Sequence, residues 1–170
     1  MTYGLINEEP VIRTFSGKWV NVFEPKKDSI VIEDIAHALS NLCRFGGHPP
    51  KHYSVGQHSV HCCQMIKREH KFAALLHDAS EAYMVDIPSP IKRNLVNYKE
   101  IEDRLMKVIA DVFGFQYPLH KDVHTVDNLM LQIEWDNVML GNKTVPEFTF
   151  YSPEKSKKEF LELFTTYKKY

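Results

Sequence analysis

The run Leu75-Leu76-His77-Asp78-Ala79-Ser80-Glu81-Ala82 places an imidazole and two carboxylates inside an apolar, helix-forming stretch. On a helix over about 72–84, Glu81 follows His77 by four residues and Asp78 by three, so the three side chains can share one flank. Burying them beside leucine and alanine is unfavourable unless something compensates their charge, and a metal ion does so efficiently. The alternative is a hydrogen-bonded core histidine beside a solvated Asp-x-x-Glu edge. The run predicts a metal site in a helical protein.

The size and composition of the chain predict one domain with an ordinary core. At 170 residues, the chain can bury about two-thirds of its unfolded surface. A net charge of −1 gives no footprint for binding a nucleic acid polymer. The apolar runs are too short to span a bilayer, and Met1-Thr2-Tyr3-Gly4-Leu5 lacks the basic and apolar regions of a signal peptide. We therefore expect a cytoplasmic protein with no membrane partner.

The cysteines and histidines point away from a disulfide framework and toward a histidine site. Cys43, Cys62 and Cys63 include no C-x-x-C pair, which excludes the usual disulfide and thiolate zinc patterns. We expect these cysteines to fill space in buried helices. Nine histidines are a mild excess for this length, and histidine is the commonest metal-binding side chain.

The first part of the chain predicts a β-hairpin followed by two helices. Alternating apolar residues over about 11–23 flank a plausible turn at Ser16-Gly17-Lys18. From about residue 30 the apolar spacing is helical and ends before Gly46. Ser54 and Gln57 then form a capping box at the start of a second helix.

The second part of the chain predicts three more helices after the His77 helix. One covers Tyr98–Phe113, with Gly114 as its C-terminal stop. Another, capped by Thr125, reaches about residue 140. Ser152 begins a last helix over about 153–168, whose apolar side can serve as core or interface. The prediction is one all-α domain over 1–170, a helical bundle with its core over about 30–140 and a short N-terminal β-hairpin.

Two further residues can complete a metal site with His77 and Asp78. His58 lies in the first turn of the Ser54-capped helix, and Asp127 lies in the first turn of the Thr125-capped helix. Side chains at such positions point into the gaps between helices, where bundle sites are built. Alone, each is more often a cap or surface residue. Together, two imidazoles and two carboxylates suit Zn, Mn, Co or Fe and leave positions open for water.

This set resembles the HD-domain metal-dependent phosphohydrolases. Their signature is a His, a His-Asp doublet and a distant Asp, all on helices, and His58, His77-Asp78 and Asp127 match it in order and approximate spacing. The stretch from His77 through Asp86-Ile87-Pro88-Ser89-Pro90-Ile91-Lys92 is similar to bacterial 5′-deoxynucleotidases. The wider pattern over 32–92 is similar to a short-chain group of phages and bacteria that includes the phage dATP triphosphohydrolases. The resemblance covers roughly 14–140.

The resemblance implies the roles of the site residues and the cofactor. His58, His77, Asp78 and Asp127 take the metal-ligand roles, with Zn, Co or Mn as the ion. Glu81 matches the glutamate that positions or activates the attacking water. Many relatives have Glu before the first ligand histidine, whereas this chain has Gln57, so the surroundings of the metal can differ.

The resemblance also implies the residues that bind a substrate. Arg44 matches an arginine that binds phosphate, and Lys92 matches a second phosphate contact. Asp86 lies where an aspartate near the sugar disfavours a 2′-hydroxyl. Trp19 and Val20 lie where related enzymes place residues near the base. From the residues alone, Arg44 can instead be a helix C-terminal cation, Trp19 a core anchor of the hairpin, and Asp86 a turn cap.

The implied activity is hydrolysis of deoxynucleotides, with dATP triphosphohydrolase first and a 5′-deoxynucleotidase of broad base specificity second. A non-catalytic nucleotide-binding HD module is a third reading. HD-type enzymes with two metals are a fourth, because His120 and His124 lie between the doublet and Asp127. The resemblance further implies a homo-oligomer, a dimer or hexamer, in the cytosol of a bacterium or a phage-infected host.

Overall fold

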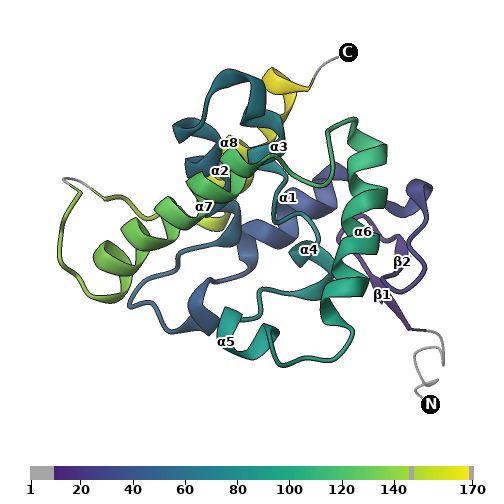
Figure 1. Cartoon of the computed structure of the whole chain (residues 1–170), viewed down its shortest axis with the longest axis horizontal. Coiled ribbons are helices and arrows are strands. Elements are labelled where there is room, and N and C mark those ends of the chain that lie inside the picture. The colour runs from purple at the N-terminus through teal and green to yellow at the C-terminus, as the bar shows by residue number, and fades with distance from the viewer. Residues whose placement is uncertain (1–9, 146–147, 169–170) are drawn as a thin grey trace.

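The structure is a computed structural model of the chain, and it describes residues 10–145 and 148–168. The N-terminal segment Met1–Leu5, used above to argue against a signal peptide, lies outside this range. The described residues confirm an all-α bundle with a short N-terminal β-hairpin (Figure 1). The α-helices are α1 (Ile32–Asn41), α2 (Val55–Met65), α3 (Lys71–Leu75), α4 (Glu81–Met84), α5 (Ser89–Lys92), α6 (Tyr98–Phe113), α7 (Lys121–Glu134) and α8 (Pro153–Tyr167).

The hairpin consists of β1 (Val11–Arg13) and β2 (Trp19–Asn21), which pair antiparallel. Gly17 takes a positive φ of 87° in the turn, a conformation that glycine adopts without steric cost. The hairpin is fixed to α1 because the amide and the hydroxyl of Ser16 donate to the two carboxylate oxygens of Asp34, at 2.6 and 2.8 Å. This end of the molecule lies beside α6 and away from α7 (Figure 1).

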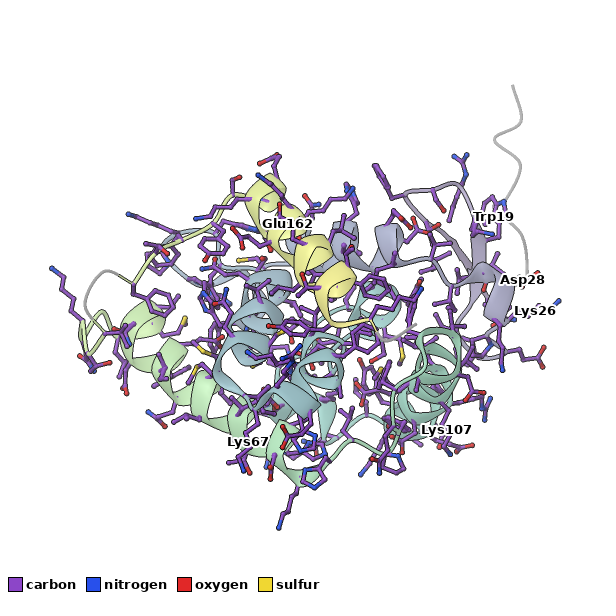
Figure 2. All side chains as sticks on the ribbon, turned by 90° about the horizontal axis from the view of Figure 1, so that it is seen from above. Trp19, Lys26, Asp28, Lys67, Lys107 and Glu162 are labelled. Atoms are coloured by element: carbon purple, nitrogen blue, oxygen red, sulfur yellow. The ribbon has the colours of Figure 1, made fainter. Side chains whose placement is uncertain are left out.

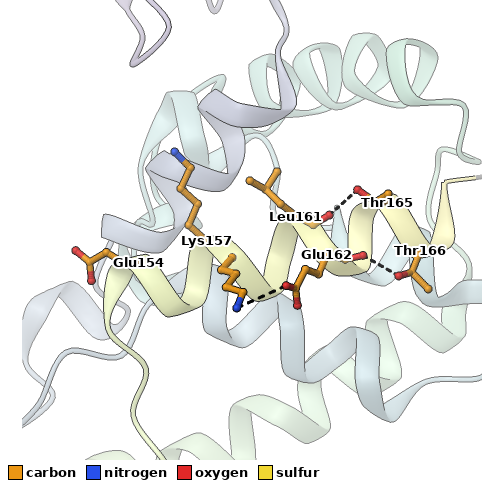
Figure 3. Close-up of a pocket in the computed structure, with 7 residues that line it drawn as sticks. Glu154, Lys157, Leu161, Glu162, Thr165 and Thr166 are labelled. Carbon is orange, nitrogen blue, oxygen red and sulfur yellow. Dashed lines mark hydrogen bonds and ion pairs between the residues drawn. The ribbon is translucent and has the colours of Figure 1, made fainter.

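The main core forms where α1, α2 and α8 pack together. Gly56 allows the close approach, since a Cβ there would lie 2.7 Å from Ser156 Oγ and 2.8 Å from Ser40 Oγ. The apolar side of α8 faces this core, because Phe160 is fully buried and Phe164 nearly so. Its outer face carries charged side chains around a surface pocket that contains none of the candidate metal ligands (Figure 3).

A second core cluster joins α7 to α2 and α3. It includes Cys62 and Val126, and it holds α7 across the start of the α3–α4 segment. The expectation for Cys62 and Cys63 is confirmed, since both are fully buried on α2. The expectation for Cys43 is wrong: it is half-buried and lies after the end of α1, where it forms an isolated bridge with Ser54.

The predicted helix starts differ in their outcome. Ser54 caps α2 by accepting from the Gln57 amide at 3.0 Å, and Ser152 caps α8 by accepting from the Lys155 amide at 3.2 Å. Thr125 does not cap α7. The capping residue is His120, five residues earlier, because the His120 imidazole accepts from the Asp122 amide and α7 begins at Lys121.

The last part of α7 changes form before the chain leaves the bundle. The helix continues into η4 (Trp135–Met139), a π-helical turn. Among the described residues, no helix is both long enough and apolar enough to cross a membrane.

Candidate metal centre

The centre of the site is a pair of buried imidazoles whose Nε2 atoms face each other at 3.2 Å. His58 comes from the first turn of α2, and His77 from the turn that follows α3. Nδ1 of His58 donates to Glu134 Oε1 at 2.6 Å, and Nδ1 of His77 donates to the Ala74 carbonyl at 2.7 Å. Each Nε2 therefore presents a lone pair to the other. Two facing lone pairs repel unless a cation lies between them.

Two carboxylates complete the donor set. Asp78 Oδ2 lies 3.2 Å from His77 Nε2 and 3.7 Å from His58 Nε2. Asp127 Oδ1 lies 3.1 Å from His58 Nε2 and 3.6 Å from His77 Nε2. Metal–ligand bonds of about 2.0–2.2 Å in a tetrahedral site put neighbouring ligand atoms about 3.3–3.6 Å apart. The observed separations bracket this range, so these residues fit a single divalent ion.

The charges around the two histidines also favour a cation. Burial lowers the pKa of His77, but Asp78 and Asp127 outweigh it and raise that pKa well above its usual value. Burial raises the pKa of Asp78, yet the two histidines hold it near 2. The cluster therefore holds positive charge strongly, either as protons or as a metal ion that displaces them.

A turn, and not one continuous helix, presents His77 and Asp78. The predicted helix over 72–84 is wrong: α3 ends at Leu75 and α4 starts at Glu81. Between them, the Ala79 amide donates to the Leu76 carbonyl and the Glu81 amide donates to the Asp78 carbonyl. Adjacent residues on a regular helix diverge by about 100°. The tight turn brings both adjacent side chains to the same ion site.

Cys62 lies next to this centre, and the sequence analysis missed its position. His58, Cys62, His77 and Asp127 form a group that could hold a metal ion, with donor atoms all within 4.8 Å of one another. Cys62 Sγ is 3.6 Å from His58 Nε2 and 4.0 Å from His58 Nδ1. Because the sulfur is nearly as close to Nδ1 as to Nε2, it lies off the direction of the Nε2 lone pair. The four-residue spacing from His58 on one helix is the signal that could have found it.

Glu134, another residue that the sequence analysis missed, orients His58. It comes from the end of α7, seven residues or two helical turns after Asp127, and is fully buried. Its Oε1 accepts from His58 Nδ1 and from the Tyr53 hydroxyl at 2.9 Å, while its Oε2 pairs with the Arg44 guanidinium at 2.9 and 3.0 Å. Burial raises the pKa of Glu134, but His58 and Arg44 outweigh it and keep the carboxylate ionised. Such a partner fixes the tautomer of a metal-binding histidine.

Glu81 lies at the start of α4 with its carboxyl buried beside the metal candidates. Its Oε2 has no hydrogen-bond partner among the described residues. Burial raises the pKa of Glu81 well above its usual value, and the charges of Asp78 and Asp86 raise it further. An unsatisfied buried oxygen costs about 1–3 kcal/mol, which a water or ligand in the site would relieve.

The structure brings three of the predicted substrate-binding residues to the same charged cluster. Arg44 is buried, with its Nη1 3.8 Å from Asp78 Oδ2. Its guanidinium therefore pairs with site carboxylates and does not serve as a C-terminal cation of α1. Asp86 is half-buried, and burial raises its pKa while Arg44 lowers it. Lys92 Nζ binds Glu102 and lies 3.8 Å from Glu81 Oε1.

Trp19 and Val20 are not brought to this cluster. Val20 is fully buried in the main core, because strand alternation turns its side chain inward. Trp19 is 49% exposed and lines a surface pocket with Lys26 and Asp28. Figure 2 shows these three side chains together at one end of the molecule.

His120 and His124 lie outside the metal centre, contrary to a two-metal arrangement. His120 precedes Asp127 by seven residues on α7, a rise of about 10 Å, whereas paired metals lie about 4 Å apart. His124 is exposed. His120 stacks instead on His70, with ring centroids 4.3 Å apart.

Gln57 does not complete the capping box that the sequence predicts. Its side-chain amide donates to the Thr149 carbonyl at 2.7 Å, and its carbonyl oxygen accepts from the Tyr151 amide at 2.9 Å. Gln57 therefore anchors the segment before α8 to the helix that carries His58.

Comparison with known proteins gives the family of the chain. No protein-family model matches it. The uncharacterized protein YfdR of Escherichia coli K12 is 47% identical over 123 residues, which cover 72% of this chain and 69% of YfdR. The chain belongs to the YfdR family. The uncharacterized protein RCAP_rcc00048 of Rhodobacter capsulatus is 28% identical over 156 residues, or 84% of this chain and 80% of that protein. The match to RCAP_rcc00048 therefore extends over most of both proteins.

Proposed function

We propose that this member of the YfdR family is a metal-dependent phosphohydrolase of the HD-domain type that acts on 2′-deoxynucleotides. The observation that carries the proposal is the pair of Nε2 atoms of His58 and His77, 3.2 Å apart with both Nδ1 atoms committed elsewhere. Asp78 and Asp127 supply the carboxylates that such a site needs. An ion bound there would supply Lewis acidity and lower the pKa of water toward neutrality.

Glu81 is the proposed water-positioning residue. Its unpartnered Oε2 is available to accept a hydrogen bond from a water molecule. Its raised pKa suits a group that takes a proton from water and returns it to a leaving group. The Lys92 ammonium, whose Nζ lies 3.8 Å from Glu81 Oε1, favours the ionised form of the Glu81 carboxyl group.

Arg44 and Lys92 are the proposed phosphate contacts. Attack on a phosphorus atom increases the negative charge on the phosphoryl oxygens, and a guanidinium can neutralise it with two parallel hydrogen bonds. Arg44 Nη1 is the part of that group nearest to Asp78 and therefore to the ion site. Asp86, close to Arg44 and Lys92 in the charge cluster, is the proposed sugar contact.

Within this class, we propose dATP triphosphohydrolase activity, which would release deoxyadenosine and phosphate, with Zn, Co or Mn as the ion. The support for the substrate is the sequence resemblance to the phage group. A 5′-deoxynucleotidase acting on dNMPs would use the same ion site and the same Glu81. The unsatisfied Glu81 oxygen favours both enzymes over a module that binds a nucleotide without turnover.

The test is release of phosphate and nucleoside from the four dNTPs, the dNMPs and ATP, with Zn, Co or Mn added to the metal-free protein. Selective breakdown of dATP supports the triphosphohydrolase, and turnover of dNMPs of any base supports the nucleotidase. If the protein binds nucleotides but shows no turnover with Zn, with Co and with Mn alike, the proposal that it is an enzyme is overturned.

Two variants separate the roles of the residues. Asp78→Ala should lose both bound metal and turnover, whereas Glu81→Gln should keep the metal and lose most of the activity. Asp111→Asn, at an exposed carboxylate on α6, is the matched control and should change neither. Full turnover by Asp78→Ala would contradict the assigned site.

A further inference from the structure

A second cluster of metal-binding side chains lies at the N-terminal end of α7. His120 is the capping residue of that helix, and Asp122 lies in its first turn. His70 ends the 3₁₀ turn η3 (Arg68–His70), immediately before α3. The cluster therefore joins two segments that are 50 positions apart in the sequence (120 against 70).

The three side chains lie next to one another. The rings of His70 and His120 are stacked, with centroids 4.3 Å apart and planes within 10°. His70 Nε2 lies 3.8 Å from Asp122 Oδ2, and His120 Nδ1 lies 3.6 Å from Asp122 Oδ1. One donor atom from each residue lies within 4.8 Å of those of the other two.

These separations suit a shared ion better than direct hydrogen bonds. Both imidazole–carboxylate distances exceed the range of about 2.7–3.2 Å for an N–H···O hydrogen bond. The separation between His70 Nε2 and Asp122 Oδ2 is close to the ligand–ligand spacing of about 3.3–3.6 Å in a tetrahedral zinc site. His120 Nδ1 accepts from the Asp122 amide at 3.2 Å, so its Nε2 is the nitrogen left to bind an ion. Because an imidazole lone pair lies in the plane of its ring, the His120 ring has to turn out of its stack on His70 for both rings to bind one ion.

We propose that His70, His120 and Asp122 form a second divalent-metal site, of the class that takes Zn²⁺, Ni²⁺ or Cu²⁺. Two imidazoles and one carboxylate are the ligand types that these ions prefer, and the remaining positions stay open to water. All three residues are half-buried, so an ion reaches them from solvent without local unfolding.

An ion at this second site would link the two segments that build the first. The segment that begins with His70 continues through α3 to His77 and Asp78, and α7 continues to Asp127. Fixing the start of α3 to the start of α7 would limit the separation of these ligands. An ion at the second site would thus stabilise the arrangement of the first site. Binding of metal at the second site does not depend on the proposed catalytic activity.

The test is the zinc stoichiometry of the full chain, measured by equilibrium dialysis and elemental analysis. The wild-type protein should bind two equivalents of Zn²⁺, and His120→Ala should bind one, with at least a tenfold loss of affinity for the second. His124→Ala is the matched control, because His124 lies on the same helix and is exposed. It should still bind two equivalents.

His70→Gln gives an independent variant on the other segment and should also bind one equivalent, with cooperative thermal unfolding as the check that each variant folds. The proposal is overturned if His120→Ala and His70→Gln both retain two equivalents, or if His124→Ala loses one as well. Asp78→Ala distinguishes this proposal from the proposed function, since it should lose the first equivalent and keep the second.

Discussion

Substituting Glu134 by glutamine tests whether this buried carboxylate tunes the metal centre. The carboxylate accepts from His58 Nδ1 at 2.6 Å and holds the Arg44 guanidinium at 2.9 Å. A glutamine of the same shape can present its oxygen to only one of these two donors, because its amide group is itself a donor. Either His58 or Arg44 therefore loses its acceptor.

The expected effect follows from the burial and the short distance. Loss of such a histidine partner typically lowers metal affinity by 10- to 100-fold, or about 1.4–2.7 kcal/mol. Glu134 and His58 are both fully buried, so no solvent replaces the lost bond, and we expect the upper end of that range. In this variant Arg44 still has the Asp78 carboxylate at 3.8 Å, so its charge is not left without a partner. The free energy of unfolding should therefore fall by about 3 kcal/mol, the lower end for a broken buried ion pair.

The assay is competition of the metal-free protein with a chromophoric zinc chelator, together with urea unfolding. Tyr53→Phe is the control: it removes one hydrogen bond of 2.9 Å to Glu134 but leaves the carboxylate, so affinity should change much less. If the glutamine variant does not fold, Glu134→Asp keeps the charge and tests the geometry instead. A folded glutamine variant with zinc affinity within about twofold of wild type would refute the reasoning.

Three further outcomes are expected. Burial lowers the pKa of His61 to about 4, so the folded state resists protonation of this residue. Its contribution to the free energy of unfolding is complete above about pH 6.5 and is lost as the pH drops toward 4. The free energy of unfolding of His61→Gln in urea should therefore decrease less steeply with falling pH. Gly56→Ala should cost about 3 kcal/mol in the same assay, because the new Cβ would lie 2.7 Å from Ser156 Oγ and 3.1 Å from Ser40 Cα. Gly114→Ala, in open space at a φ of +77°, should cost about 1 kcal/mol, and equal losses at both glycines would contradict the packing argument. Removal of bound metal with a chelator should lower the melting temperature, and Asp78→Ala should abolish that difference.

The sequence by itself determined the elements that depend on local interactions. The helix Tyr98–Phe113 has the predicted bounds, and Gly114 takes the left-handed conformation that ends it. Ser54 and Ser152 cap their helices as expected, since a capping hydroxyl needs only an amide three residues away. The sequence also indicated which residue types form the candidate metal centre, because a buried His-Asp pair needs a compensating charge wherever it occurs.

Only the tertiary structure decided how these groups meet. Glu134 reaches His58 across 76 residues of sequence, and no local pattern encodes that contact. The break between α3 and α4 arises where the chain must turn both His77 and Asp78 toward α2 and α7, although helix propensity alone favours a continuous helix. Tertiary packing also decided that Trp19 lies apart from the candidate metal centre. Strand pairing sets the direction of its side chain, but the packing of the hairpin on α1 sets its position in the molecule.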